Sequence, residues 1–202
     1  MGFDTSDATL VAGLWDLATE TVLDVRTWEL GRQLATELHP CLGAVMAGRT
    51  WQELGAIAVG CGPGSFTGTR LGVVTARILA QQLAIPLIGL SSLGVMAWHH
   101  RQHLRVRDGV VSRAAQQGHQ YVGIYRYEHS ALKAVWGDRL VTEAESEELL
   151  ATWPMPYEVL TAPAPADYGH ALLTWAAWHW QDTLRSGGTL PHWSSVVPLY
   201  GK

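Results

Sequence analysis

A glycine-rich loop between two apolar segments is the part of this sequence best suited to chemistry. Glycines and hydroxyl residues stand at five positions of residues 62–68: Gly62, Gly64, Ser65, Thr67 and Gly68. Such glycines permit positive backbone angles and the close approach of another backbone, while the hydroxyl groups can cap the amides of a following helix. Because a helix N-terminus has unpaired N–H groups and partial positive charge, the loop could hold an anion.

Two interpretations of this loop stay open from its residues alone. It could bind a phosphate or another anion, or it could be a tight strand-to-helix connection that binds nothing. A Walker phosphate loop is excluded, because that chemistry needs a lysine directly after the glycines and the chain's lysines are Lys133 and Lys202. Arg70 favours an anionic neighbour, since a cation in the first turn of a helix opposes the helix dipole.

Other groups of chemically active residues are weaker signals. His99, His100 and His103 have helical spacing, but no carboxylate or cysteine accompanies them, so a solvated polar turn is expected. The acidic residues within 143–148 are expected to begin a helix with a solvated face. The sequence contains no Gly-x-Ser-x-Gly elbow, so a hydrolase triad has no support from it.

Composition limits the function further. The 202 residues are 48% hydrophobic and 16% charged, which suits one ordinary domain or two small ones. The net charge of −4 leaves no basic excess, so contact with nucleic acid is expected only through a partner. Two cysteines, Cys41 and Cys61, cannot form a disulfide framework or a four-ligand zinc site, and the expected compartment is a reducing cytoplasm. Neither a signal peptide nor a membrane span is expected.

The apolar pattern predicts the elements that position the loop. The expected strands of the first half are 8–15, 21–26, 56–60 and 85–90, after a very short strand at the start. The expected helices are 32–46 with Pro40 inside it, the segment from the loop to about residue 83, and the segment from Ser91 to Trp98.

The second half has a weaker pattern. Strands are expected at 110–111, 121–127 and 131–135, and a helix at 167–184, with a proline-rich stretch between them. We expect an α/β fold with mixed strand directions, an N-terminal domain at residues 1–98 and a smaller, divergent domain at 99–202. No internal sequence repeat is visible.

Taken whole, the loop resembles the signature of the TsaB (YeaZ) family. The segment Gly62-Pro63-Gly64-Ser65-Phe66-Thr67-Gly68, followed by a variable residue, Arg70, a second variable residue and Gly72, matches nine fixed positions in eleven. The flanks agree with the family: Asp4-Thr5-Ser6, residues 85–93 and Pro198-Leu199-Tyr200. The resemblance is strong from residue 4 to residue 97.

This resemblance implies a two-domain fold of the actin, sugar-kinase and Hsp70 (ASKHA) type. It also implies a role in placing a threonylcarbamoyl group on adenosine 37 of ANN-decoding tRNAs. Members of the family are partners and not catalysts: they form a heterodimer with a TsaD-type paralogue, joined by a TsaE-type ATPase. By this resemblance the chain contacts tRNA only through the complex, could form a homodimer when alone, and needs no cofactor.

The resemblance also implies which residues lack or hold a role. TsaD-type proteins bind a metal through a His-x-x-x-His pair, whereas residues 34–40 offer only His39 before a proline, so neither a metal site nor a catalytic residue is expected. The expected loop residues, with possible anion contact, are Asp4, Thr5, Ser6, Gly62, Gly64, Ser65, Thr67, Gly68 and Arg70. Residues 114–121 depart from the family pattern. The alternative function is an ATP-dependent small-molecule kinase or ATPase, in which Asp4 and the loop would hold phosphates.

The helix after the loop has two apolar stripes at 100° per residue. A helix that covers one sheet needs only one stripe, so the second must meet another helix or another protein. The broad stripe is assigned to the sheet, and the narrow stripe to the partner surface, beside the first helix. The predicted partner-binding residues are Leu71, Val74, Ile78, Leu38 and Leu42.

Overall fold

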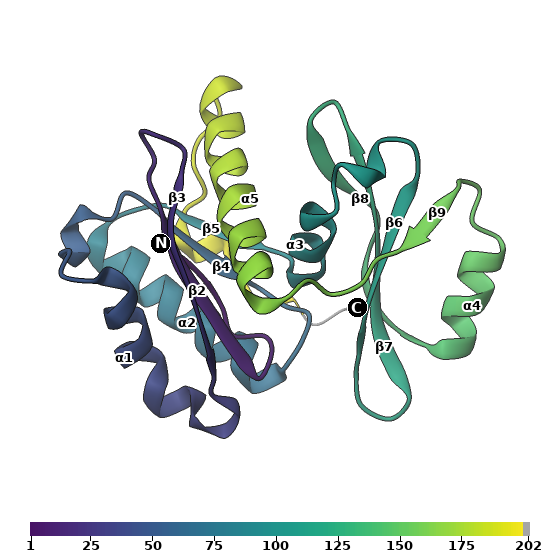
Figure 1. The fold of residues 1–202 in the computed structure, drawn as a ribbon, viewed down its shortest axis with the longest axis horizontal. Coiled ribbons are helices and arrows are strands. Elements are labelled where there is room, and N and C mark those ends of the chain that lie inside the picture. The colour runs from purple at the N-terminus through teal and green to yellow at the C-terminus, as the bar shows by residue number, and fades with distance from the viewer. Residues whose placement is uncertain (200–202) are drawn as a thin grey trace.

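The computed structural model describes residues 1–199 and contains two mixed β-sheets with helices around them (Figure 1). The strands are β1 (Gly2–Asp4), β2 (Thr9–Trp15), β3 (Val22–Glu29), β4 (Ile57–Gly60), β5 (Leu87–Leu90), β6 (Asp108–Ala114), β7 (His119–Glu128), β8 (Ala131–Thr142) and β9 (Tyr157–Val159). The α-helices are α1 (Leu34–Met46), α2 (Phe66–Leu83), α3 (Ser92–His99), α4 (Glu143–Ala151) and α5 (Pro165–Arg185). The expected α/β fold with mixed strand directions is confirmed.

The two sheets share one topology. The first sheet has the order β3-β2-β1-β4-β5, and the second has the order β8-β7-β6-β9. In each sheet an antiparallel three-strand meander is followed by a helix and then by a strand that pairs in parallel with the first strand of the meander. The chain therefore repeats one structural unit although its sequence shows no repeat. This doubled arrangement confirms the expected ASKHA type.

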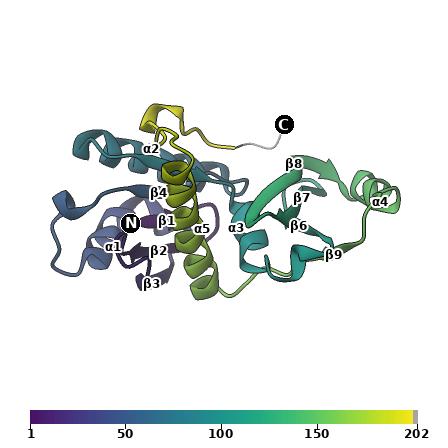
Figure 2. The ribbon, with the colours of Figure 1, turned by 90° about the horizontal axis from the view of Figure 1, so that it is seen from above.

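Helices cover the first sheet on both faces (Figure 2). Residues of α1 and α2 pack with Phe3, Leu10 and Ile57 on one face. Residues of α5 pack on the other face, in a core that also includes α3 and, from the second sheet, Val111 and Tyr125. The two halves of the molecule thus share one hydrophobic core.

The helix α5 follows the second sheet in sequence but lies on the first sheet, against β1, β2 and β3. Glycines make this approach possible: a Cβ at Gly13 or at Gly2 would lie 2.8 Å from Leu173, and one at Gly169 would lie 2.6 Å from Val11. The proposed division at residue 98 separates the strands of the two sheets, while α5 covers the earlier one.

Helix ends follow the sequence closely. Ser65 caps α2 by accepting from the Gly68 N–H at 3.2 Å, and Ser91 caps α3 by accepting from the Gly94 N–H at 2.9 Å. The acidic run begins α4, where Thr142 and Glu145 form a capping box. The helix at 32–46 starts two residues later than expected, after a short 3-10 turn, and Pro40 lies inside it.

The largest differences from the expected elements are in the second half. The strand expected at 131–135 continues to residue 142, and β9 was not expected at all. Both segments leave apolar side chains exposed, such as Val135, Leu140 and Val159. An edge strand whose side chains are mostly exposed lacks the regular alternation by which a strand is recognised.

An ion pair between the buried Asp108 and the half-buried Arg126 holds the start of the second sheet. The carboxylate of Asp108, which is fully buried, accepts from Arg126 Nε at 2.7 Å, from Arg126 Nη2 at 2.9 Å and from Trp153 Nε1 at 2.9 Å. Burial alone would raise the pKa of Asp108, but the hydrogen bonds from Arg126 and Trp153 outweigh it and hold that pKa below its ordinary value.

Arg126→Met should therefore destabilise the protein by about 3 kcal/mol at pH 7, because it leaves a buried carboxylate unpaired. Since the pKa of Asp108 is lowered in the folded protein, the contribution is complete above about pH 4 and is lost as the pH falls through the lowered pKa. Thermal unfolding at several pH values checks both parts. The control is Arg26→Met, which breaks an exposed pair with Asp24 and should cost less than about 1 kcal/mol. Equal losses in the two variants would contradict this account.

Candidate functional site

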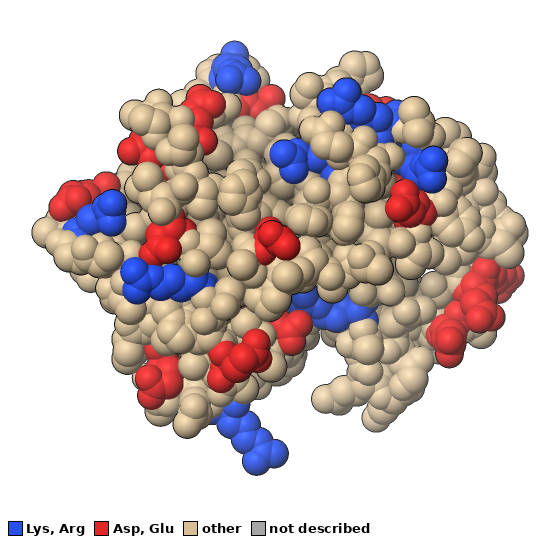
Figure 3. All heavy atoms as spheres, viewed as in Figure 1, with Lys and Arg blue, Asp and Glu red and all other residues tan. Residues whose placement is uncertain are grey.

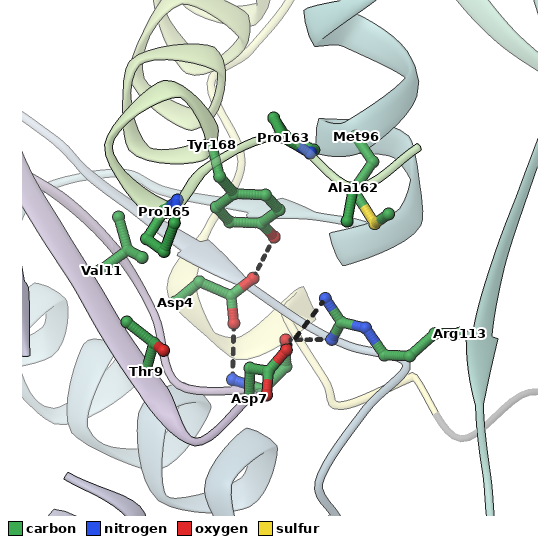
Figure 4. A pocket seen from close by; sticks show the side chains of 11 residues that line it. Asp4, Asp7, Thr9, Val11, Met96, Arg113, Ala162, Pro163, Pro165 and Tyr168 are labelled. Atoms are coloured by element: carbon green, nitrogen blue, oxygen red, sulfur yellow. Dashed lines mark hydrogen bonds and ion pairs between the residues drawn. The ribbon is translucent and has the colours of Figure 1, made fainter. Parts of the chain in front are cut away.

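The Asp4 carboxylate lies at the centre of the junction between the two halves (Figure 4). It ends β1, and only 3% of the residue is exposed. One oxygen accepts from the Ser6 N–H at 2.6 Å. The other accepts from Ser92 Oγ at 2.7 Å and from the Tyr168 hydroxyl at 2.5 Å. Asp4 thus joins its own turn to the start of α3 and to α5.

Tyr168 was not predicted as a site residue. Burial, and next the charge of Asp4, raise the pKa of its hydroxyl well above the ordinary value, so Tyr168 remains a proton donor at neutral pH. In the sequence it continues the buried stripe of α5 by helical spacing with Leu172 and Trp175. The sequence did contain a signal for Tyr168: it is a tyrosine at the start of an otherwise apolar stripe, and a buried hydroxyl group needs a hydrogen-bond partner.

The signature glycines hold the turn that follows Asp4. A Cβ at Gly64 would lie 2.3 Å from the Ser6 carbonyl oxygen, and one at Gly68 would lie 2.1 Å from the Thr5 carbonyl oxygen. Of the three loop glycines, Gly62 alone has a positive φ, at 86°. Gly64 and Gly68 do not use the positive angles that glycine permits, whereas the expected close approach of another backbone is confirmed.

Hydrogen bonds join the turn and the loop. The Ser65 N–H donates to the Ser6 carbonyl at 2.7 Å, and Thr5 Oγ1 donates to the Gly68 carbonyl at 2.7 Å. Residues 4–6 therefore pack against the start of α2, beside the amides that the anion prediction invoked. Thr67 is exposed at the same end of the helix. Contact with an anion stays a prediction.

Arg113 connects the second sheet to this turn and was not predicted. From the end of β6 its Nη1 atom donates to Ser6 Oγ at 2.9 Å and to the Pro63 carbonyl at 3.2 Å, and Nη2 lies 3.9 Å from Asp7. Its side chain is 19% exposed. An arginine inside a half-buried strand was the only sequence signal, and nothing in the sequence indicated that it would meet Ser6.

Two hollows adjoin the turn. The smaller, about 90 Å³, lies between Asp4, Arg113 and Tyr168 and has apolar walls that include Met96 and Pro165 (Figure 4). The larger, about 1020 Å³, separates residues 64–67 from residues 114–121. The segment that departs from the family pattern thus forms one wall of the larger cleft. Within residues 1–199 no group of three or more His, Cys, Asp or Glu is placed to hold a metal ion.

The predicted partner residues divide between the surface and the core. Val74 and Ile78 on α2 are 51% and 53% exposed, and Leu71 is half-buried beside them. Leu38 and Leu42 of α1 are 0% and 1% exposed and belong to the core with Phe3 and Ile57. Their assignment to the partner surface is corrected: they hold α1 on the sheet, because their stripe faces inward.

The exposed stripe of α2 extends toward the signature loop. Phe66, Arg70, Val74 and Ile78 are four residues apart and so follow one face of the helix. Phe66 is 56% exposed, and the Arg70 guanidinium lies 3.9 Å from the centre of its ring. Arg70, predicted as an anion contact, is thus placed over an aromatic ring on the outer face. Tyr200 of the predicted closing motif lies outside the described residues, while Leu199 donates from its N–H to the Cys61 carbonyl at 2.7 Å.

Comparisons with protein-family models and with known sequences find the same group of relatives. A family model described as TsaD, tRNA N6-adenosine threonylcarbamoyltransferase, matches residues 30–161. The chain is 33% identical over 154 residues to the tRNA threonylcarbamoyladenosine biosynthesis protein TsaB of Bacillus subtilis, covering 74% of the chain and 65% of that protein. It is 37% identical over 73 residues to TsaB of Escherichia coli, covering 35% of the chain and 32% of that protein. The matches thus span about a third to two thirds of these relatives.

Solved structures share the fold over nearly the whole chain. A Pseudomonas aeruginosa protein with similarity to the peptidase YeaZ superposes with a TM-score of 0.75 at 20% identity, over 100% of this chain and 98% of that one. YeaZ from the same organism has a TM-score of 0.70 at 19% identity, over 98% of this chain and 97% of that one.

Gly68→Ala should destabilise the protein by about 1–3 kcal/mol, because the added methyl group meets the Thr5 carbonyl and the turn at Asp4 must shift. The matched control is Gly43→Ala in α1, where a Cβ meets nothing within 4 Å and the substitution should stabilise by about 0.5–1 kcal/mol. Chemical denaturation of both variants measures the difference. Stability of Gly68→Ala at or above that of the unmodified chain would show that the contact is loose.

Proposed function

Because the chain belongs to the TsaD (tRNA N6-adenosine threonylcarbamoyltransferase) family, and within it to the TsaB (YeaZ) group, we propose that it is a non-catalytic partner subunit in tRNA threonylcarbamoyladenosine biosynthesis. It pairs with a TsaD-type paralogue, which transfers the threonylcarbamoyl group to adenosine 37 of ANN-decoding tRNAs. The observation that carries this proposal is the exposed apolar stripe of α2, which begins inside the signature itself.

The stripe has the composition of an interface. Aromatic residues and arginine are enriched where proteins meet, and here an exposed phenylalanine ring lies under an arginine. The exposed side chains of Val74 and Ile78 extend the apolar surface along the helix. Since Leu38 and Leu42 fix α1 on the sheet and Val73 and Ala76 fix α2, this surface rests on a packed core. We therefore assign the TsaD-type partner to the outer face of α2, beside α1.

The environment of Asp4 supports a non-catalytic role. Three hydrogen bonds from the protein itself engage both carboxylate oxygens, so that binding of a metal or nucleotide there would have to break them. In the proposed complex the reaction belongs to the partner. The two buried thiols, Cys41 and Cys61, form no disulfide and suit the reducing cytoplasm in which tRNA is modified.

Surface charge supports an indirect role toward tRNA. The acidic side chains Glu143, Glu145, Glu147 and Glu148 are exposed on α4 and gather on one end of the molecule (Figure 3). That end repels a phosphate backbone. In this proposal the TsaD-type partner binds the tRNA, and a TsaE-type ATPase joins the complex. The isolated chain could pair with itself through the exposed stripe of α2.

None of the helices among residues 1–199 has the length and apolar character to cross a bilayer.

A second function, an ATP-dependent kinase or ATPase, is favoured only by the cleft of about 1020 Å³ beside residues 64–67. The two functions predict different solution behaviour. As a partner subunit, the purified chain should neither hydrolyse ATP nor modify tRNA, and tRNA modification should appear only after a TsaD-type protein is added. Isothermal titration with ATP and ADP, together with a tRNA modification assay, tests this. Micromolar nucleotide affinity with turnover by the chain alone would favour the kinase.

Ile78→Glu should lower the affinity for a TsaD-type partner by at least about 100-fold, or about 3 kcal/mol, because a carboxylate at a buried interface centre has no partner. The two proteins should then no longer co-elute. The isolated variant should keep its circular dichroism spectrum and melting temperature, since Ile78 is 53% exposed.

The control is Leu184→Glu on α5, which is 54% exposed on the other face of the first sheet and should bind normally. If Ile78→Glu binds the partner normally and tRNA modification still requires the partner, then the interface lies elsewhere on this chain. The proposed function would stand.

A further inference from the structure

A polar cluster at the start of α3 lies outside the proposed partner surface. Two consecutive serines there donate hydrogen bonds to carboxylates in different halves of the molecule. Ser92 Oγ donates to Asp4 of the first sheet at 2.7 Å, and Ser91 Oγ donates to Asp138 of the second sheet at 2.5 Å. The cap of α3 thus connects a carboxylate in each half of the molecule.

The position of Asp138 depends on an irregularity in the second sheet. Val122 pairs with Arg139 and Ile124 pairs with Trp136, so that Gly123 stands opposite two residues, 137 and 138. Such a bulge redirects side chains. A Cβ at Gly123 would lie 2.4 Å from Asp138 Oδ1, so this strand position leaves room for the carboxylate.

Two hydroxyl groups hold the carboxylate. The Tyr125 hydroxyl donates to Asp138 Oδ1 and lies 3.0 Å from Ser91 Oγ. Burial raises the pKa of Tyr125 well above its ordinary value, so Tyr125 keeps the proton that it donates. The ion pairs found among residues 1–199 do not include Asp138.

The carboxylate of Asp138, which has no cationic partner, is not explained by stability alone. Burial raises the pKa of Asp138, which means that its charged form is less stable here than in water. A neutral side chain of the same shape would avoid that cost. The bulge, the vacant side-chain position at Gly123 and the two hydroxyl donors nevertheless place an acid at this point of contact between the halves.

The contact lies where it can set the width of the large cleft. Ser91 immediately precedes α3, and α3 packs against β6, β7 and β8. The strands β6 and β7 carry residues 114–121, one wall of the cleft, while Ser92 accepts from the Gly62 N–H of the loop that forms the other wall. A change at Asp138 is therefore transmitted to one wall relative to the other.

We propose that Ser91, Tyr125 and Asp138 form a latch that fixes the angle between the two halves and hence the width of the cleft between residues 64–67 and 114–121. Loss of the latch leaves two other contacts between the halves: the shared hydrophobic core, which is not directional, and the hydrogen bonds of Arg113 to Ser6 and Pro63. The latch is a property of this chain alone and does not depend on the proposed partner.

Distances between spin labels test the latch. Labels at Gln82→Cys on α2 and Gln116→Cys at the cleft are both exposed, while the native Cys41 and Cys61 are buried. Dilution with unlabelled protein removes distances between two copies. The chain with its native latch residues should give one narrow distribution of distances between the two labels. Asp138→Ala should give a broader distribution with a longer mean distance, measured well below its melting temperature.

Matched variants separate a latch from a merely stabilising contact. Asp138→Asn, whose amide can accept from Tyr125 and donate to Ser91, should keep the narrow distribution, and so should Glu147→Ala on α4. Tyr125→Phe removes one hydrogen bond and should broaden the distribution partly. If Asp138→Ala has the narrow distribution of the unmodified chain, or if it fails to fold while Tyr125→Phe remains narrow, the cluster only stabilises the fold and the latch is refuted.

Discussion

The burial of one carboxylate governs the arrangement of this protein. Asp4 is almost inaccessible to water, and a buried charge is tolerated only where donors surround it. Its donors come from its own turn, from the start of α3 and from α5, three segments far apart in the sequence. The turn can lie so deep only because the start of α2 has no side chains at the positions that it touches. The signature glycines are thus a consequence of where Asp4 is placed.

The signature therefore has two separate physical tasks. Its glycines face inward and receive the turn at residues 4–6, whereas Phe66 and Arg70 face outward and begin the exposed stripe of α2. A single eleven-residue segment links the packing at the junction to the surface that we assign to a partner. Distortion of the turn would move both, because α2 is one continuous helix.

Much of the fold was predictable from the sequence, and much of the site was not. The first half has strong apolar periodicity and clear caps at Ser65 and Ser91, so its elements lie within two or three residues of their predicted bounds. The long β8 and the short β9 are edge strands without alternation, and local patterns do not show them. Arg113, Tyr168 and Asp138 act through partners 100 or more residues away, or across a bulge, and no spacing rule reports such contacts. The error at Leu38 and Leu42 had another cause: a resemblance named a helix, but only burial shows which of its faces is free.

The return of α5 to the first sheet has a consequence for synthesis. Until this helix leaves the ribosome, the face of the first sheet that contains Val11, Ala58 and Ile88 has no cover from it. Residues 165–185 are made after the whole second sheet, so the N-terminal half cannot reach its final state before most of the chain exists. Chain segments usually fold in order as they emerge, and here the last α-helix covers the first sheet. During that interval the nascent chain presents an apolar sheet face, which is the kind of surface that chaperones bind.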